Sequence, residues 1–473
     1  MSDKHTVSER IEDHALERVP PGDRHNWLQI SWNTAGIVTT LIQIYIGATI
    51  TFMAGMELGL LTGLCVAIIG GALGWGLGHI AYRSGLAATV MSRLYGFGVK
   101  GSLITSAIFG FIIIGFIAVE NILLYKGFIY YFGLEDTLQN QILIYGLLSL
   151  AWIALTAYGF DIVTRVASIT LVGFLGVLIY MMFTIVGETG QSWREVLNFG
   201  VQFSDAELAE AGALSTYGKV VVAVNMMMGP AGALALVDAD LGRYARSSKD
   251  IGIAAYIGNF FMDVAMVGLG GIIMYAVVHY SAAAQGISTE EARLLTSQSP
   301  EHVAIAFILF GGWIGTVLMV LAQSKAQVLN TYSSSLSLTN LFDAVFSWRP
   351  GRLFFVILAN LLAIGFLYGE ILTFFYNFLK ILGILTTCFS GIIMADYFIV
   401  RPRLGHEDTD RFGADYVNWA GVTSIVIGFV LAHYVLNDLI PIEFLTSLAV
   451  SFLVYPILRI YVLKPHYHSA RIE

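Results

Sequence analysis

Two ionisable residues, Glu120 and Lys325, lie within or beside long apolar stretches of this chain. A charge at the centre of a bilayer-spanning helix costs roughly 2.5 to 3.5 kcal/mol, so such residues generally mark a substrate or ion pathway. An ionised carboxylate only accepts hydrogen bonds, whereas an ammonium group only donates them. We therefore expect these two side chains to belong to the working site, where a polar solute or an ion is bound.

The composition is that of a membrane protein. Of the 473 residues, 57% are hydrophobic and 12% are charged, whereas about 25% of residues are charged in a typical soluble domain. The sequence has no basic patch for nucleic acid, no spaced His, Asp or Glu set for a metal, and no Gly-x-x-x-x-Gly-Lys loop for ATP. These features argue against an enzyme, a cofactor and an ATP-driven pump.

The cysteines and the N-terminal segment fit the same class of protein. Cys65 and Cys388 fall in separate apolar runs, so we expect no disulfide bond. Residues 1–25 carry charges of both signs and lack the apolar core of a signal peptide. This segment is therefore expected to be a cytoplasmic tail.

Twelve apolar runs are long enough to be transmembrane helices. A hydrocarbon core about 30 Å thick requires about 20 apolar residues per helix, and runs this continuous exclude the alternating strands of an outer-membrane barrel. The runs cover approximately residues 27–53, 58–82, 102–131, 140–160, 162–186, 216–238, 250–280, 303–337, 353–373, 376–399, 416–434 and 440–463. The sequence thus predicts an all-α polytopic membrane protein.

Basic residues indicate the orientation of these helices. If the N-terminus is cytoplasmic, the loops on the opposite side contain only Lys126, Arg194, Lys219 and Arg293, and the other basic loop residues fall on the cytoplasmic side. This distribution follows the positive-inside rule. An even number of spans then places both termini in the cytoplasm, and we expect a multi-pass protein of the cytoplasmic (inner or plasma) membrane.

The sixth run has a proline, Pro230, flanked by glycines near its expected midpoint. A proline removes a backbone donor and clashes with the preceding turn, so we expect a broken helix, with a simple kink as the alternative. Transporters built from inverted repeats form their substrate sites at such breaks. If runs 1–5 and 6–10 are inverted repeats, the first run should also break, where Thr39, Thr40, Gln43 and Gly47 give a weaker signal.

Three short motifs occur in order along the chain. Residues 92–101 contain an arginine followed by Phe-Gly-Val-x-Gly, residues 239–244 read Ala-Asp-Leu-Gly-Arg-Tyr, and residues 395–397 read Ala-Asp-Tyr ahead of Arg401. Together with twelve spans, these motifs resemble the nucleobase–cation symporters, the group that contains cytosine permeases and hydantoin transporters. Residues 11–20 are similar to the purine and cytosine permease branch.

The resemblance implies two inverted five-helix repeats of the LeuT type, followed by two C-terminal helices. The expected division is a tail (1–26), the first repeat (27–186), an external loop (187–215), the second repeat (216–399), the two additional helices (400–463) and a second tail (464–473).

The resemblance also implies a substrate site between spans 1, 3, 6 and 8, with an aromatic ring from span 3 stacked on the substrate. Phe116 and Glu120, four residues apart on one helix face, are the best candidates in this chain. Relatives more often have an amide in place of Glu120, and a carboxylate suits the amine and ring N–H groups of cytosine or a purine, or a cationic nitrogen compound. Glu120 is alternatively an internal ion-pair partner or a packed, protonated acid. Further residues expected to line the site are Gln43, Met228, Gly229, Ala231 and Gln327.

Lys325 falls where sodium-dependent members of the family place hydroxyl side chains. An ammonium group cannot ligate sodium but can replace its charge, so the resemblance implies that Lys325, with Glu120, couples transport to protons. Lys325 alternatively anchors the cytoplasmic end of span 8. A deeper position is favoured by the polar face formed by Gln323, Gln327 and Asn330.

Other charged residues have less defined roles. Asp238 and Asp240 fall beside Arg243 where span 6 leaves the membrane, and we expect a cytoplasmic gate, involving Asp240 and Arg243, or a structural pair. Lys380 in span 10 either snorkels or faces a water-filled path. Relatives place a second aromatic ring in span 6, where this chain has methionines and small residues, so the identity of the substrate stays open.

We therefore expect a secondary active importer of a nucleobase of the cytosine or purine type, which is proton-coupled, sodium-independent and monomeric in the bilayer. One alternative is an importer of another small nitrogen compound, such as a pyrimidine vitamin precursor, a hydantoin-like compound or a cationic amidine. Another is sodium-coupled symport. A channel or receptor would need a continuous pore or an added soluble domain, and no loop is long enough to form such a domain.

Overall fold

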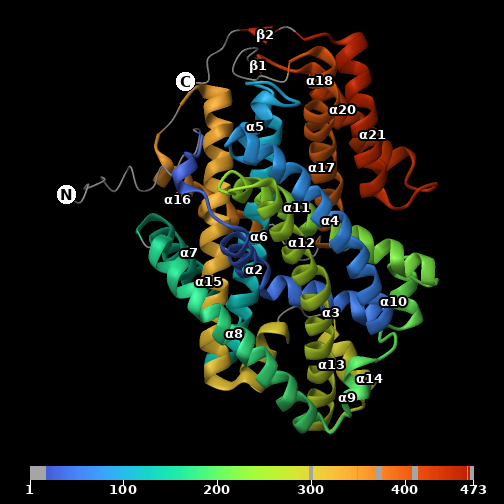
Figure 1. Cartoon of the computed structure of the whole chain (residues 1–473). Coiled ribbons are helices and arrows are strands. Elements are labelled where there is room, and N and C mark those ends of the chain that lie inside the picture. The colour runs from blue at the N-terminus through green and yellow to red at the C-terminus, as the bar shows by residue number, and fades with distance from the viewer. Residues whose placement is uncertain are drawn as a thin grey trace.

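The computed structural model describes residues 18–158, 160–297, 302–348, 350–368, 375–406, 414–465 and 467–468. Within these residues the chain is almost entirely helical (Figure 1). The short strands β1 (Ala414–Asp415) and β2 (Tyr467–His468) form an antiparallel pair. The predicted all-α class is confirmed.

Most of the predicted spans are helices that cross the molecule in one piece or with a short π-helical turn. Among the described residues, eight stretches are long and apolar enough to cross a membrane. They are formed by α4 (Met56–Ser84), α6 (Ser102–Phe132), α7 (Leu138–Tyr158), α8 (Phe160–Thr189), α11 (Thr216–Gly242), α12 (Ser248–Phe260) with η2 (Phe261–Ala265) and α13 (Met266–Gln285), α17 (Phe375–Ala395) with η3 (Asp396–Val400) and α18 (Arg401–Leu404), and α21 (Glu443–Ile457) with η5 (Leu458–Val462).

Four further helical stretches complete the set of spans. α2 (Trp27–Val38) and α3 (Leu41–Ala54) meet at an angle of 68°, and α15 (His302–Phe346) is bent by 68° between its two parts. The shorter apolar helices are α16 (Arg352–Tyr368) and α20 (Trp419–Val430), which continues into η4 (Leu431–Val435). Each of the twelve predicted runs thus has a helical counterpart. Loops carry η1 (Pro21–Asp23), α5 (Ala88–Leu94), α9 (Trp193–Leu197), α10 (Asp205–Glu210) and α14 (Thr289–Ser297).

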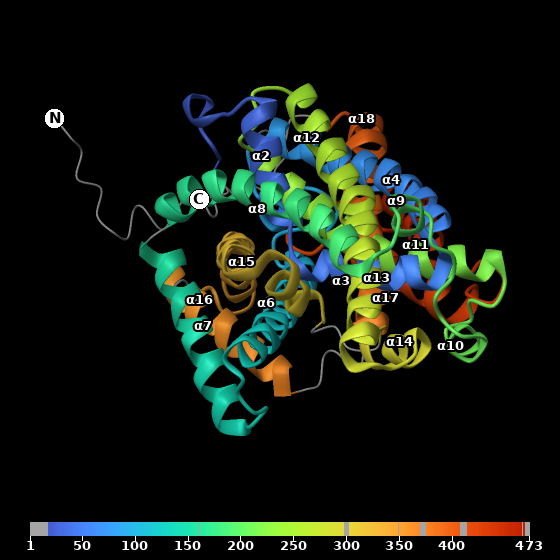
Figure 2. The ribbon, with the colours of Figure 1, turned by 90° about the horizontal axis from the view of Figure 1, so that it is seen from below.

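The helices form two groups that lie side by side. α15 is surrounded by α6, α7, α8 and α16, whereas α4 packs against α11 and α12 in the second group (Figure 2). The pairings are reciprocal between the repeats: α11 packs along α4, and the equivalent α2 and α3 pack along α12 and α13. α6 and α15, the third span of each repeat, pack on one another. This arrangement is the one expected of two inverted five-helix repeats.

The chain breaks in the first span and not in the sixth. α11 continues through Pro230, so the predicted break there is wrong. Thr39 and Thr40 instead leave the helical conformation between α2 and α3, as the repeat hypothesis required of the first span. Proline is tolerated in a transmembrane helix where its surroundings satisfy the freed backbone groups.

The glycines beside Pro230 permit close packing. A Cβ atom at Gly229 would lie 2.5 Å from the carbonyl oxygen of Leu379 in α17, and one at Gly232 would overlap the hydroxyl of Thr386 in the same helix. Small residues let helices approach one another in membranes. The glycines that suggested a flexible break therefore fix α11 against α17.

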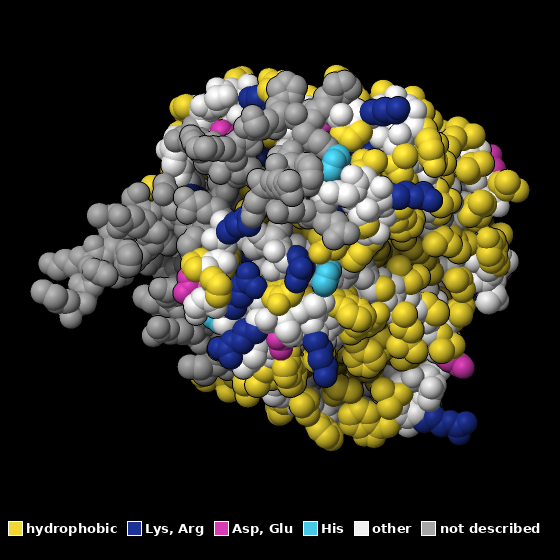
Figure 3. All heavy atoms as spheres, turned by 45° about the horizontal axis from the view of Figure 1, so that its top comes forward, with side chains coloured by type: hydrophobic (Ala, Val, Ile, Leu, Met, Phe, Trp, Pro, Cys, Tyr) yellow, Lys and Arg dark blue, Asp and Glu magenta, His cyan; other side chains and the backbone are white. Residues whose placement is uncertain are grey.

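One end of the molecule is rich in basic side chains. Figure 3 shows Lys and Arg side chains gathered on the face that comes forward from the top of Figure 1, with apolar side chains covering the flank beside it. The helix ends and loops assigned to the cytoplasmic side carry Arg83, Lys100, Arg246, Lys249 and Arg403. We call this end of the molecule the basic end, and its charge matches the side that the sequence assigned to the cytoplasm.

Candidate functional site

A small cavity of about 50 Å³ lies where the broken first span meets α6, α11 and α15. It is lined by Ile37, Val38, Thr40, Ile42, Gln43, Ile113, Phe116, Glu120, Pro230, Ala233, Leu234, Val237, Met262 and Asn330. Sites for small molecules usually enclose roughly 300 to 1,000 Å³. This central cavity is therefore contracted in the conformation observed. It brings together three of the predicted site residues, Gln43, Phe116 and Glu120.

Glu120 is tied to the break in the first span through one amide side chain. The carboxylate, in a residue only 1% exposed, accepts a hydrogen bond from Nε2 of Gln323 in α15. The oxygen of the same amide accepts from the backbone N–H of Leu41, at 3.3 Å, which is the first residue of α3. Gln323 thus bridges the carboxylate and a helix N-terminus. Among the described residues Glu120 forms no ion pair, so the ion-pair alternative has no partner there.

Phe116 contributes an aromatic wall to the central cavity. Its ring meets Phe378 of α17 edge-on, with centroids 6.0 Å apart, which fixes its orientation. The opposite wall from α11 consists of Pro230, Ala233, Leu234 and Val237. As the sequence indicated, the sixth span provides no second ring at this cavity.

Lys325 lies inside the molecule, against the first half of the broken span. Its side chain is 3% exposed, and Nζ donates to the carbonyl oxygen of Trp32 at 3.4 Å. A Cβ atom at Gly36 would overlap the end of the lysine, so this glycine makes the close approach in α2 feasible. Since α15 continues to Phe346, Lys325 does not anchor the end of its helix.

A larger cavity of about 270 Å³ adjoins the central one toward the basic end. Lys325, Asp240 and Arg243 line it, and Ile37, Val237 and Asn330 line both cavities. The two predicted charges are therefore distributed between adjacent spaces: Glu120 at the central cavity and Lys325 at the larger one. Asn330 lies where these spaces meet.

Four of the predicted substrate residues face other helices. Gln327 donates to the carbonyl oxygen of Ile117 and to Asn121, at 3.1 and 2.9 Å, and so joins α15 to α6. The remaining three are Met228 and Gly229, which pack against α17, and Ala231, which packs against α4. Met228, Gly229 and Ala231 were predicted to line the cavity because α11 was expected to break there. Since α11 is continuous, these three residues face α17 and α4 instead of the cavity.

Two polar residues at the junction were not among the predicted site residues. Gln323 holds Glu120, and Asn330 lines both cavities. Their seven-residue spacing on one face of span 8 was the available signal. Thr40 also lines the central cavity, where its hydroxyl interacts with the Glu120 carboxylate.

Asp240 and Arg243 connect α11 to its neighbours at the mouth of the larger cavity. Oδ1 of Asp240 accepts from the backbone N–H of Ala88 at 2.7 Å, at the start of α5. Arg243 donates to the Tyr332 hydroxyl of α15 at 3.1 Å. The structure separates Asp240 from Asp238, which faces α4 at Gly74. A gating role for Asp240 and Arg243 stays a prediction.

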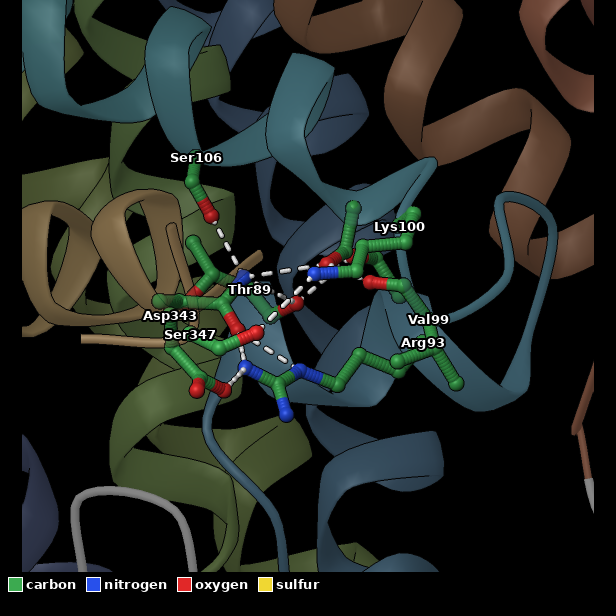
Figure 4. A network of polar contacts seen from close by, with 10 residues as sticks. Thr89, Arg93, Val99, Lys100, Ser106, Asp343 and Ser347 are labelled. Carbon is green, nitrogen blue, oxygen red and sulfur yellow. Dashed lines mark hydrogen bonds and ion pairs between the residues drawn. The ribbon is translucent and has the colours of Figure 1, made fainter. Parts of the chain in front are cut away.

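The motif around Arg93 forms a polar network at the basic end. Arg93 pairs with Asp343 at 2.7 Å and donates to Asn340, and both partners belong to α15 (Figure 4). Asn340 in turn donates to Ser106 of α6 at 2.6 Å. In the same view Lys100 reaches Ser347 at 3.4 Å. This network joins α5 and α6 to the end of α15.

The third motif contacts the first. Oδ2 of Asp396 accepts from the backbone N–H of Gly96 at 2.9 Å. Arg401 donates to the carbonyl oxygen of Leu94 and lies 4.8 Å from the centre of the Tyr95 ring. The motifs that carried the resemblance therefore hold the basic end together, away from the central cavity.

Lys380 forms an ion pair with Glu443 at the start of α21. Glu443 also accepts from His433 at 2.7 Å, and its own backbone N–H donates to Asn225 of α11 at 3.1 Å. Lys380 therefore joins α17 to α21 through an ion pair. The sequence had suggested only that it snorkels or faces a water-filled path.

Twelve spans, a broken first span and a small central cavity beside buried charges define a membrane transporter with its solute site inside the helix bundle. The sequence matches a family model for permeases for cytosine/purines, uracil, thiamine and allantoin over residues 32–454. The chain belongs to this family, and it is a transporter rather than an enzyme. None of the curated proteins compared matches the sequence significantly.

Solved structures share the fold at low sequence identity. Mhp1, a nucleobase-cation-symport-1 family transporter, in a closed conformation with bromovinylhydantoin bound, is similar with a TM-score of 0.69 and 15% identity over 94% of each chain. Its inward-facing conformation gives 0.67 and 15% over 93% of each chain. A Na⁺-coupled sialic acid symporter gives 0.63 and 12% over 96% of this chain and 93% of its own. The predicted LeuT-type fold is confirmed.

Proposed function

We propose that this protein imports a nucleobase-like heterocycle across the cytoplasmic membrane by alternating access, coupled to protons and not to sodium. The proposal rests mainly on the hydrogen bonds by which the Gln323 amide connects Glu120 to the backbone N–H of Leu41. A heterocycle that donates N–H groups to Glu120 would compete with Gln323 for the carboxylate. Substrate binding would then act directly on the break in the first span.

The position of Lys325 supports coupling without sodium. Broken helices of this class of transporter present backbone carbonyls to a coupling cation. Here the ammonium group of Lys325 lies against the first half of the broken span and donates to the carbonyl oxygen of Trp32 within α2. A positive charge at this place would repel a second cation. The proton then takes the coupling role, with Glu120 as one group that accepts it.

Counterflow in proteoliposomes tests the substrate. Vesicles loaded with unlabelled cytosine, adenine, guanine or uracil should accelerate entry of the labelled compound. If no nucleobase competes, the nucleobase proposal fails.

A second candidate is a small nitrogen compound of another type, because α11 offers no ring to complete a stacking sandwich at the cavity. The same counterflow assay, with a pyrimidine vitamin precursor, a hydantoin and a cationic amidine, separates the two candidates.

Ion replacement tests the coupling. Uptake should persist when choline replaces sodium and should fall when the proton gradient is collapsed. Strong sodium dependence would overturn the role proposed for Lys325. Lys325→Gln should keep counterflow but lose accumulation, because the ammonium group is absent.

The basic end is proposed to face the cytoplasm, with the protein acting as a monomer. Single cysteines in place of Lys249 at the basic end and of Arg194 in the opposite loops should react from opposite sides with a membrane-impermeant thiol reagent. Both residues are exposed. Labelling of both from one side would contradict this orientation.

A further inference from the structure

Three buried polar side chains between α4, α11 and α12 have atoms without a hydrogen-bond partner in the described part of the chain. These atoms are both carboxylate oxygens of Asp238, one of Asp263 and the amide oxygen of Asn259. Asp238 and Asn259 are 0% exposed and Asp263 is 3% exposed. None of the three lines the central or the larger cavity, so the proposed transport site leaves them unused.

The three residues follow one glycine-rich face of α4. From the basic end, the contacts are Asp238 with Gly74, Asn259 with Gly70, and the backbone of Asp263 with Gly63. Four residues of helix rise about 6 Å, and both Gly70 to Gly74 and Asn259 to Asp263 are steps of four. The side chains of Asp238 and Asn259 therefore lie about one turn apart along α4. Asp263 follows Asn259 by four residues on its own helix, and its backbone lies against Gly63, about two turns from Gly70. We call these three residues the row.

An ionised carboxylate without partners is very costly in such a place, and a buried acid generally becomes neutral or holds a cation. The amide nitrogen of Asn259 donates to the carbonyl oxygen of Ala255 at 2.9 Å, which leaves its oxygen as an open acceptor beside the row. A protonated carboxyl group has one hydrogen to donate. In the described part of the chain, these residues therefore present unpartnered acceptor oxygens and no donor to pair with them. A proton on either carboxyl group would supply the missing hydrogen-bond donor.

Ionisable side chains on the neighbouring helices do not fill this role. They are Glu57, Cys65, His79, Tyr82 and Arg83 on α4, Tyr217, Lys219 and Asp240 on α11, Lys249, Asp250 and Tyr256 on α12, Tyr275, His279 and Tyr280 on α13, and Tyr376, Lys380 and Cys388 on α17. In the described part of the chain none of them pairs with either acid. His79 and Asp240 are engaged elsewhere: His79 contacts Ser248 at 2.8 Å, and Asp240 accepts a hydrogen bond from the backbone N–H of Ala88.

A metal ion fits this row poorly. The described residues contain no group of three or more His, Cys, Asp or Glu side chains that could hold one. The two acids are separated by the Asn259 step, so one ion could not bridge both carboxylates. A proton needs only one carboxyl group and one acceptor.

We propose that Asp238 and Asp263 are proton-binding sites of this transporter, each neutral in the conformation observed and each releasing its proton at another step of the cycle. Both acids directly follow a residue of the cavity wall, since Val237 and Met262 line the central cavity. Asp263 also lies in the π-helical turn η2, and such turns often occur at functional sites. The inference rests on the proposed proton coupling.

Infrared difference spectroscopy of the whole transporter in vesicles measures the protonation directly. At about neutral pH the wild type should show the carbonyl stretch of a protonated carboxylic acid, which shifts in heavy water. Asp238→Asn and Asp263→Asn should each remove part of this band. The matched control Glu57→Gln changes an exposed acid at the start of α4 and should leave it intact. A band untouched by both Asp variants would overturn the inference.

Gradient-driven uptake links these protons to transport. One pH unit across the membrane supports about tenfold accumulation per coupled proton. Asp238→Asn should lose this accumulation while retaining counterflow, because the amide mimics the neutral acid and cannot release a proton. Accumulation at the wild-type level would overturn the inference for Asp238. If one variant does not fold, the other variant and the wild-type band still decide.

The two proposals fail in different ways. If wild-type uptake ignores the proton gradient, the proposed function is wrong, whatever the infrared band shows. If wild-type uptake follows the gradient but the Asp variants keep both the band and the accumulation, only the further inference is wrong. Loss of the wild-type band on adding sodium would show a cation site instead of proton sites.

Discussion

The polar residues at the basic end and those around the central cavity differ in how completely they are satisfied. Arg93 pairs with Asp343 and Asn340, and Asn340 also bonds Ser106. Near the cavity, the ammonium group of Lys325 has one long contact, at 3.4 Å, to the carbonyl oxygen of Trp32. Buried polar groups with full sets of partners rigidify a structure. Groups with few partners are available to a substrate or an ion.

Among the fully hydrogen-bonded residues at the basic end, Arg93→Ala should cause the largest loss of stability. Removing one partner of a buried ion pair typically costs about 3 to 5 kcal/mol, because the remaining charge is left unpaired. Thermal unfolding in detergent should show a strong loss of stability. Lys100→Ala, whose contact to Ser347 is at 3.4 Å, is the control and should unfold close to the wild type. If Arg93→Ala and Lys100→Ala lost equal thermal stability, the Arg93 network would not be the source of rigidity at the basic end.

Glu120→Gln should act on function while leaving stability nearly unchanged. Hydrogen bonds to charged groups contribute about 1.5 to 3 kcal/mol, so discrimination between substrates rich in N–H donors and those rich in carbonyls should shift by roughly 10- to 100-fold. Competition between cytosine and uracil in counterflow measures this shift. Unaltered preference would assign Glu120 to packing alone.

Gly229→Ala tests whether the cavity wall depends on the close contact of α11 with α17. The added Cβ atom would lie 2.5 Å from a backbone carbonyl of Leu379, and overpacking typically costs about 1 to 3 kcal/mol. Gly146→Ala in α7 meets nothing within 4 Å and is the matched control. It should be neutral or slightly stabilising, since alanine favours helix. Equal thermal stability of the two variants would contradict the packing role.

Arg293→Gln, in the loops opposite the basic end, should have the smallest effect on stability. Arg293 forms ion pairs with Glu207 at 2.9 Å and with Glu290 at 2.8 Å. Partial burial alone would raise the pKa of Glu207, but hydrogen bonds from Ser204 and Arg293 hold that pKa below its ordinary value. A lowered pKa in the folded state stabilises the protein above the ordinary value of about 4.3 and loses this contribution as the pH falls through the lowered pKa. The difference in melting temperature between wild type and Arg293→Gln should therefore shrink on acidification. A difference independent of pH would point to packing instead.

Helix-level features of the fold followed from the sequence because they depend on local composition. Runs of about 20 apolar residues have one stable conformation in lipid, since every backbone group must be satisfied internally. The position of the helix break was harder to predict, because Pro230 and Gly229 are compatible both with a broken helix and with close packing of a continuous one. In the folded protein α11 is continuous, and Gly229 packs closely against Leu379 of α17. Once α11 stayed continuous, the side chains assigned to the cavity from a broken helix pointed elsewhere.

By itself the sequence determined the membrane class, the twelve spans and the two buried charges, because burying a charge in an apolar run is costly wherever the run folds. Only the tertiary structure decided what each charge meets. It placed Glu120 on the amide of Gln323, Lys325 against Gly36, and Asp238 without a partner in the described part of the chain. These contacts join residues far apart in the chain, and their geometry depends on how the helices pack.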